Sequence, residues 1–306
     1  MDFLIDAAHH GKTVRSYIQH TLSISSRMLT VLKQTEMGIA VNGEHVTVRR
    51  VLCQGDVLSL AIDDTPERAS HNVPPSDIPL DVIYEDAHII VMNKPPHMPT
   101  HPSHNHHDDT LANALAFRYA KEGIPFVFRP MGRLDRNTSG IVLAAKDKVA
   151  SGQLTSAIKA GEVHKTYLAI ATGEMPVDGM THTVDCGIRR QADSVIMRTT
   201  CPDSTDPSEV SVTDYEVLDT CDGLSLVRVR PRTGRTHQIR VHFAYIGHPL
   251  LGDELYGTQD TRIDRHALHA LSLEFPLPFS EVRMEQTAPL PADMRGLISQ
   301  YFPRYS

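Results

Sequence analysis

The chain has few cysteines and no long apolar run, and each of these absences argues against a class of protein. Its four cysteines are widely spaced and form no C-x-x-C pair, which is poor material for a zinc site or a disulfide framework and fits a reducing cytoplasm. No stretch approaches the ~18–20 apolar residues that cross a bilayer. The opening MDFLIDAAHHGKT lacks the basic start and apolar stretch of a secretory signal. We therefore expect a cytoplasmic protein that binds no membrane.

Several common catalytic motifs are also missing. The sequence has no Gly-rich phosphate loop, no nucleophile elbow and no metalloprotease helix. The net charge of −7 argues against general affinity for nucleic acid, because phosphate binding depends on clustered Lys and Arg. Residues 228–240 (RVRPRTGRTHQIR) nevertheless hold five arginines and no acid. Charge alone leaves two interpretations open, a solvated basic face on a strand or a phosphate-binding surface.

A proline-rich segment divides the chain. Residues 64–80 (DTPERASHNVPPSDIPL) carry four prolines and few large apolar groups, which is typical of an extended linker. This segment separates a small unit, residues 1–63, from a larger one, residues 81–306. The small unit begins with helical periodicity and then alternates apolar residues around Asn42-Gly43, a strong hairpin signal. We expect a compact module of two helices and a short sheet.

The larger unit mixes strands and helices without a regular repeat. HIIVMNKP (88–95) has the continuous apolar run of a buried strand. TLANALAFRYAKEG (110–123) predicts a helix capped by Asp109, and THQIRVHFAYIG (236–247) predicts a helix that begins at Thr236. This interspersed order favours an α+β domain with a mixed sheet over a doubly wound one.

GRLDRNTSG (132–140) places a single acid, Asp135, between two arginines. By residue type alone, an aspartate in this position is most often part of a surface salt bridge. The segment has no second carboxylate to share a proton and no histidine to act as a base. Whether Asp135 takes part in chemistry therefore depends on the rest of the chain.

Five segments of the larger unit occur in a characteristic order. They are NKPPHMPTHPS, GRLDRNTSGIVLAAK, HKTYLAIATG, RPRTGRTHQIRVH and HPLLGDELYG. From about residue 80 to the end, this series resembles the RluA-type pseudouridine synthase family. The small unit, with SSRMLTVLKQTEMGIAVNGEHV followed by GDVLSL, resembles the RNA-binding module named after the fourth protein of the small ribosomal subunit. The resemblance implies an α+β catalytic domain, residues 81–306, with a mixed, mostly antiparallel sheet and a central cleft.

The same resemblance implies that uridine in RNA is isomerised to pseudouridine without a metal or a cofactor. The glycosidic bond to nitrogen breaks, the base rotates, and a carbon–carbon bond replaces it. Asp135 matches the catalytic aspartate of the family. One carboxylate suffices for this reaction, either as a nucleophile or as a base on the sugar, and both routes stay open. We expect large-subunit ribosomal RNA as the substrate and a monomeric enzyme, with transfer RNA as the alternative.

Other residues match the family one at a time. Arg235 matches the arginine that pairs with the catalytic aspartate and keeps it ionised. Tyr167 matches the tyrosine that stacks on the target base, although a core-facing strand tyrosine is the alternative. Arg133 matches the arginine that helps to extrude the uridine, a step that costs a few kcal/mol of unstacking. Further substrate contacts are expected from the rest of the arginine run, namely Arg230, Arg232 and Arg240.

Two rival interpretations remain. HPSHNHHDD (101–109) contains four histidines beside two aspartates, which could form a metal site, although the spacing fits no standard tetrahedral pattern. A flexible polar loop before a helix is the plainer interpretation. The second rival is an RNA-binding assembly factor whose catalytic domain has become inactive. The presence of Asp135, Tyr167 and Arg235 together argues against it.

Overall fold

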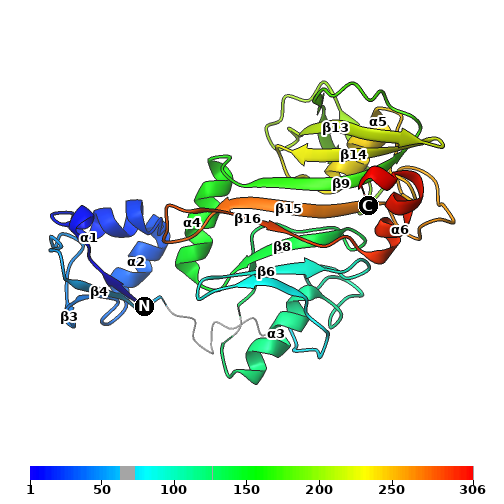
Figure 1. Ribbon diagram of the computed structural model, residues 1–306. Helices are drawn as coiled ribbons and strands as arrows, with labels where there is room; N and C mark the ends of the chain where they lie inside the picture. Colours follow the sequence, from blue (N-terminus) through cyan, green and yellow to red (C-terminus); the bar gives the residue numbers. More distant parts are fainter. Residues whose placement is uncertain (63–72, 126, 306) are drawn as a thin grey trace.

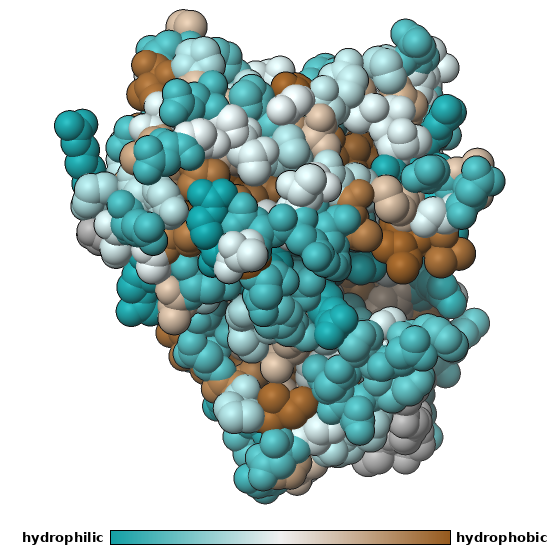
Figure 2. All heavy atoms as spheres, turned by 90° about the vertical axis from the view of Figure 1, so that its right-hand side faces the viewer, coloured by the Kyte–Doolittle hydropathy of each residue, from teal (hydrophilic) through white to brown (hydrophobic). Residues whose placement is uncertain are grey.

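A computed structural model describes residues 1–62, 73–125 and 127–305 of the protein (Figure 1). Residues 64–72, which make up half of the expected linker, lie outside the described residues. Within the described part of the chain, no helix has the length and apolar character needed to cross a membrane. Hydrophilic residues cover most of the face drawn in Figure 2, where apolar residues gather in small separate groups.

Residues 1–62 form a small module with its own apolar core. Its strands pair antiparallel in the order β1 (Asp2–Leu4), β4 (Val57–Leu60), β2 (Ile39–Val41), β3 (Glu44–His45). Its helical segments are η1 (Ala7–His9), α1 (Val14–Ser16), the π-helical turn η2 (Tyr17–Thr21) and α2 (Ser26–Gln34). Asn42 and Gly43 have φ of 52° and 81°, so the expected hairpin is present with both turn residues in the left-handed region.

Most of the described strands of the larger part form one ten-stranded sheet. Its path is β10 (His182–Asp185), β13 (Val212–Cys221), β14 (Leu224–Pro231), β9 (His164–Thr172), β15 (Leu268–Pro276), β8 (Ser139–Ala145), β6 (Ile89–Lys94), β5 (Val82–Glu85), with β16 (Arg283–Thr287) on β15 and β7 (Arg129–Pro130) on β8. Among the described pairs of this sheet, β15 and β8 alone run parallel. The sheet is therefore mixed and mostly antiparallel, as the sequence predicts. A separate hairpin consists of β11 (Gly187–Arg190) and β12 (Arg198–Cys201).

Helices cover this sheet at several places (Figure 1). They are α3 (Leu111–Lys121), α4 (Lys148–Lys159), α5 (Gln238–Tyr245) and α6 (Ala292–Tyr301), with a short 3-10 turn η4 (Pro303–Tyr305). The two helices expected from the sequence are present, but both start residues were wrong. Buried Thr110 caps α3 through a reciprocal bond with Asn113, while the Asp109 carboxylate instead lies 2.6 Å from His106 Nδ1. The N-cap of α5 is His237, one residue after Thr236.

The loop between β7 and β8, which carries Asp135, is held at both ends by the sheet. Gly140 enters β8 where that strand lies against β15, with φ +112°. A Cβ at this position would lie 2.2 Å from the carbonyl oxygen of Ala270, so only glycine permits this close approach. The final glycine of GRLDRNTSG thus fixes where the loop joins the core.

Buried Arg265 ties the same loop to the C-terminal helix. Its guanidinium binds Asp293 of α6 through Nε at 2.7 Å and Nη2 at 3.1 Å. Its Nη1 donates to the carbonyl oxygen of Asn137 at 2.9 Å and to that of Leu268 at 3.2 Å. An arginine with no exposed surface is tolerated because these acceptors satisfy it.

The N-terminal module lies against α4 and the turn between β15 and β16 (Figure 1). Val149 of α4 completes the apolar core of the module, and Gln153 Nε2 donates to the carbonyl oxygen of Thr21 at 3.1 Å. Phe279 packs on Phe3, with ring centroids 6.1 Å apart. The domain boundaries at residues 63 and 80 stay predictions.

Removing the Arg265 guanidinium should destabilise the fold strongly. In Arg265→Met, Asp293 loses its partner and the carbonyl groups of Asn137 and Leu268 lose a donor. We expect a loss of about 3 kcal/mol in unfolding free energy, which corresponds to roughly 6–10 °C in melting temperature. Arg262→Met, which breaks the surface pair with Asp260, is the matched control and should cost under ~1 kcal/mol. Equal melting temperatures for the two variants would contradict this account.

Candidate functional site

The backbone on either side of Asp135 is fixed by buried polar groups. Leu134 exchanges two hydrogen bonds with the Thr100 hydroxyl, at 3.0 and 3.2 Å. Lys94 Nζ donates to the carbonyl oxygen of Arg136 at 3.1 Å. The Asp135 side chain keeps 18% of its surface exposed, so a rigid loop presents a carboxylate that solvent and substrate can reach.

Lys94 is a structural residue in this arrangement. It is fully buried, and its Nζ also donates to the carbonyl oxygens of Pro95 and Met98, at 2.9 and 2.7 Å. Burial and the charge of Arg265 together lower the pKa of Lys94 to about 7, although the charge of Asp135 opposes both effects. Three carbonyl acceptors therefore bind an ammonium that joins the 95–98 loop to the Asp135 loop.

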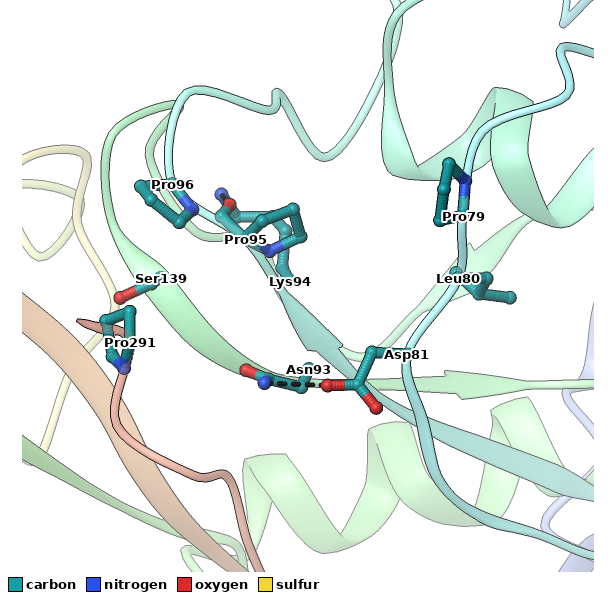
Figure 3. Close-up of a pocket in the computed structure, with 9 residues that line it drawn as sticks. All are labelled: Pro79, Leu80, Asp81, Asn93, Lys94, Pro95, Pro96, Ser139 and Pro291. Atoms are coloured by element: carbon teal, nitrogen blue, oxygen red, sulfur yellow. Dashed lines mark hydrogen bonds between the residues drawn. The ribbon is translucent and has the colours of Figure 1, made fainter. Parts of the chain in front are cut away.

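Lys94 also lines a pocket of about 380 Å³ (Figure 3). Prolines dominate its lining, and Asp81 accepts a hydrogen bond from Asn93 Nδ2 at 2.9 Å across its floor. Asp135 does not belong to the lining of this pocket. We therefore place the candidate site at the carboxylate and not in this pocket.

The cation beside Asp135 is Arg240, and the expected pairing with Arg235 was wrong. Arg240 Nη1 lies 3.6 Å from Asp135 Oδ2. Arg235 is exposed, and its guanidinium donates to the carbonyl oxygens of Val210 and Pro207 at 3.0 and 3.2 Å. The physical reason is the start of α5: residue 235 precedes the helix on the solvent side, whereas residue 240 lies on its buried face.

Arg240 is held in place by Asp253. Its Nε and Nη2 each lie 2.7 Å from one carboxylate oxygen of Asp253, and both side chains are almost fully buried. Burial alone would lower the pKa of Arg240, but the bonds to Asp253 and the charges of Asp253 and Asp135 outweigh it and raise the pKa. The backbone N–H groups of Leu255 and Tyr256 also donate to Asp253. Asp135 therefore faces a cation with one fixed position.

His237 and Tyr256 complete the surroundings of the carboxylate. His237 Nε2 lies 3.9 Å from Asp135 Oδ2, and its Nδ1 lies 2.8 Å from the Tyr256 hydroxyl. The Tyr256 ring stands 5.1 Å from the Arg240 guanidinium, a cation–π contact. Sequence reasoning missed His237, Tyr256 and Asp253, although all three stand inside the quoted family segments, which were the available signal.

Tyr167 lies on β9 and is buried. Burial raises its pKa, and the negative charge of Asp135 adds to the effect, so the hydroxyl keeps its proton at neutral pH. The side chain also packs in the main apolar core. This burial agrees with the core-facing interpretation, and stacking on the target base stays a prediction.

Lys165 lies two residues before Tyr167 on the same face of β9. Its Nζ stands beside Gly132, where an added Cβ would be only 2.9 Å away. Burial lowers the pKa of Lys165 to about 8. The missing side chain at Gly132 thus makes room for an amine next to the Asp135 loop.

The arginine run is largely balanced by acids on the neighbouring strand. Arg232 binds Asp214 of β13 through two bonds, at 2.6 and 2.9 Å, and Arg228 binds Glu216 at 2.7 Å. Arg230 makes only a long bond, 3.4 Å, to the Thr166 hydroxyl and no ion pair with a residue that the structure describes. The expected phosphate-binding surface is therefore smaller than the acid-free sequence suggests. Within the described ranges, Arg230 and Arg235 are the arginines of the run that make no ion pair.

Arg133 and the histidine segment lie near each other. Arg133 is exposed, and its charge adds to burial in lowering the pKa of His101. The His101 ring packs on Phe128, with centroids 4.7 Å apart. Throughout residues 1–62, 73–125 and 127–305, no three His, Cys, Asp or Glu side chains gather in a way that could hold a metal ion.

Comparison with known proteins gives a consistent result. The family model for RNA pseudouridylate synthase matches residues 88–245. Over 286 residues the chain is 42% identical to the uncharacterized RNA pseudouridine synthase YjbO of Bacillus subtilis, covering 94% of this chain and 98% of the relative. It is 36% identical over 274 residues to ribosomal large subunit pseudouridine synthase D of Zymomonas mobilis, covering 85% of this chain and 84% of that relative.

A solved structure agrees with these relatives. Human RNA pseudouridylate synthase domain containing 1 matches with a TM-score of 0.56 and 28% identity, over 74% of this chain and 96% of that one. The family match begins at residue 88, so the ribosomal-protein likeness of the N-terminal module stays a prediction.

Arg235 and Arg240, which lie in the same segment, make a matched test of the site. Arg240→Lys keeps the charge but cannot bind Asp253 through two bonds, so the cation beside Asp135 moves. A displacement of about 1 Å can cost roughly a hundredfold in rate, and we expect a loss of that order in pseudouridine formation at saturating RNA. Arg235→Lys should stay within about threefold of wild type. A larger loss of rate in Arg235→Lys than in Arg240→Lys would contradict this account and would favour the pairing of Asp135 with Arg235 that the sequence predicts.

Proposed function

Because the chain belongs to the RluA-type family of RNA pseudouridylate synthases, and is thus an RNA pseudouridine synthase, we propose that its substrate is large-subunit ribosomal RNA. The relative from Zymomonas mobilis is named for this substrate, and it aligns over more than four fifths of both chains. No observation favours transfer RNA. The proposal extends to a monomeric, cytoplasmic enzyme, in keeping with the scattered cysteines.

The observation that carries the chemistry is the single accessible carboxylate of Asp135 beside the fixed Arg240. Asp135 acts on the ribose of the target uridine, either by adding to C1′ or by removing a proton from the sugar. The C1′–N1 bond breaks and its electron pair leaves with the uracil. The base turns and C5 bonds to C1′, which displaces the Asp135 carboxylate in the first route and is accompanied by return of the sugar proton in the second. The proton on C5 is then lost, and N1 takes up a proton. Arg240 gives the carboxylate an electrostatic partner and a defined position throughout.

The residues around Asp135 and in the arginine run have distinct roles toward the RNA in this proposal. Tyr167 provides the ring on which the uracil stacks, with its protonated hydroxyl near Asp135. Exposed Arg133, two residues from Asp135, contacts the RNA where the uridine has been extruded. Arg230 contacts phosphate, since it has no described acid partner, whereas Arg232 is held by Asp214. Arg240 serves the carboxylate and not the phosphates.

The N-terminal module contributes affinity for RNA in this proposal. It packs against α4 and the β15–β16 turn, and the candidate catalytic groups all lie in the larger part of the chain. A separate binding module with a fixed attachment raises the local concentration of RNA near the site.

Mapping pseudouridines across all cellular RNA, with and without the gene, tests the substrate. We expect one or more positions in large-subunit ribosomal RNA to lose pseudouridine when the gene is deleted and to regain it on complementation. Transfer RNA from the same cells is the internal control and should be unchanged. Loss of pseudouridine from transfer RNA alone would contradict the proposal and favour the alternative substrate.

A further inference from the structure

His237 has an unusual backbone for a residue at a helix start. It adopts φ +60° and ψ 16° as the N-cap of α5, and its side chain does not cap the helix. The left-handed region is unfavourable for a non-glycine residue, although histidine occurs there more often than most residues. Strained residues of this kind gather at functional sites, so the position of this ring calls for an explanation.

The ring lies between two groups of the site. Its side chain is 11% exposed, with Nδ1 2.8 Å from the Tyr256 hydroxyl and Nε2 3.9 Å from Asp135 Oδ2. A separation of 3.9 Å is too long for a hydrogen bond. Nε2 therefore faces the carboxylate without being bound to it, and a substrate atom beside the line that joins the two can contact both.

The hydrogen bonds of Tyr256 favour the tautomer of His237 that carries its hydrogen on Nε2. The backbone N–H of Arg198, at the start of β12, donates to the Tyr256 oxygen at 2.9 Å. The tyrosine proton is then free to be donated, and Nδ1 of His237 is the acceptor within reach in the described structure. A neutral imidazole that accepts at Nδ1 carries its hydrogen on Nε2.

The surroundings also keep this ring neutral. Burial lowers the pKa of His237 below its usual value, Asp135 opposes this, and the charges of Arg240 and Arg198 lower the pKa further. At neutral pH the ring is therefore an uncharged N–H donor that faces the catalytic carboxylate.

We propose that His237 donates its Nε2 hydrogen bond to a carbonyl oxygen of the uracil while the base is detached from C1′. When the C1′–N1 bond breaks, the uracil keeps the electron pair of that bond. The resulting negative charge is shared between N1 and the carbonyl oxygens of the base. A preorganised donor stabilises such a charge, and no proton is transferred to or from His237. Tyr256 is the positioning residue, because its hydroxyl fixes the orientation and tautomer of the ring. The inference rests on the proposed reaction but on no particular RNA.

A set of three variants separates the donor from the backbone. Asparagine also tolerates the left-handed region, and in His237→Asn its short amide can still accept from Tyr256 but cannot reach the place of Nε2. His237→Gln brings an amide N–H close to that place. Tyr256→Phe keeps the ring under Arg240 and removes the hydroxyl. Each purified variant is assayed, with a thermal melt, for kcat and KM on an RNA that the wild-type enzyme has been shown to modify.

Loss of one donor to a developing negative charge typically costs about 10²–10³ in kcat. We expect a fall of that order for His237→Asn with KM within about threefold, at least a tenfold recovery in His237→Gln, and about a tenfold fall in Tyr256→Phe. A folded His237→Asn enzyme with kcat within threefold of wild type would overturn the proposal. Equal losses of kcat in the Asn and Gln variants would also overturn it, since a structural role predicts no rescue. Because the assay uses RNA that wild type modifies, neither result bears on whether large-subunit RNA is the natural substrate.

Discussion

The buried ion pair between Arg240 and Asp253 is the interaction on which the site depends. Two charges with almost no exposed surface are stable together only when their geometry is good and their remaining hydrogen-bonding atoms are satisfied. Asp253 meets this condition by accepting two guanidinium bonds and two backbone N–H groups. The requirement leaves Arg240 a single position, which fixes α5 and gives Asp135 a cation at a constant 3.6 Å.

A second set of buried polar groups gives Asp135 the same rigidity from the other side. Lys94 and Arg265 have no exposed surface, and each donates to carbonyl oxygens of the loop that carries the carboxylate. Gly140 allows that loop to join β8 against β15. Because the Asp135 carboxylate and its neighbouring cation are each placed by satisfied buried charges, little reorganisation is needed when the substrate binds.

The sequence was sufficient for the family and the class of fold, because five ordered segments carry that information together. The catalytic role of Asp135 stays a prediction. The sequence could not distinguish Arg235 from Arg240, since both arginines belong to one segment and the choice depends on where α5 begins. That start lies at a left-handed histidine, which helical periodicity does not predict. The acids opposite the arginine run were also hidden, because Asp214 and Glu216 come from the preceding strand and meet the run only through sheet pairing. The origin of the N-terminal module and its boundaries stay predictions.

The central claim is that Asp135 is the only carboxylate that performs the reaction, and Asp135→Asn tests it most directly. The amide keeps the shape of the side chain and can still meet Arg240, but it is neither a useful nucleophile nor a base. Binding to an RNA that contains the target uridine and formation of pseudouridine in it are measured on the same enzyme preparation, with folding checked by thermal melt. The account predicts RNA binding within about threefold of wild type and turnover lower by at least about a thousandfold. A folded Asp135→Asn enzyme that keeps a substantial fraction of wild-type turnover would contradict it.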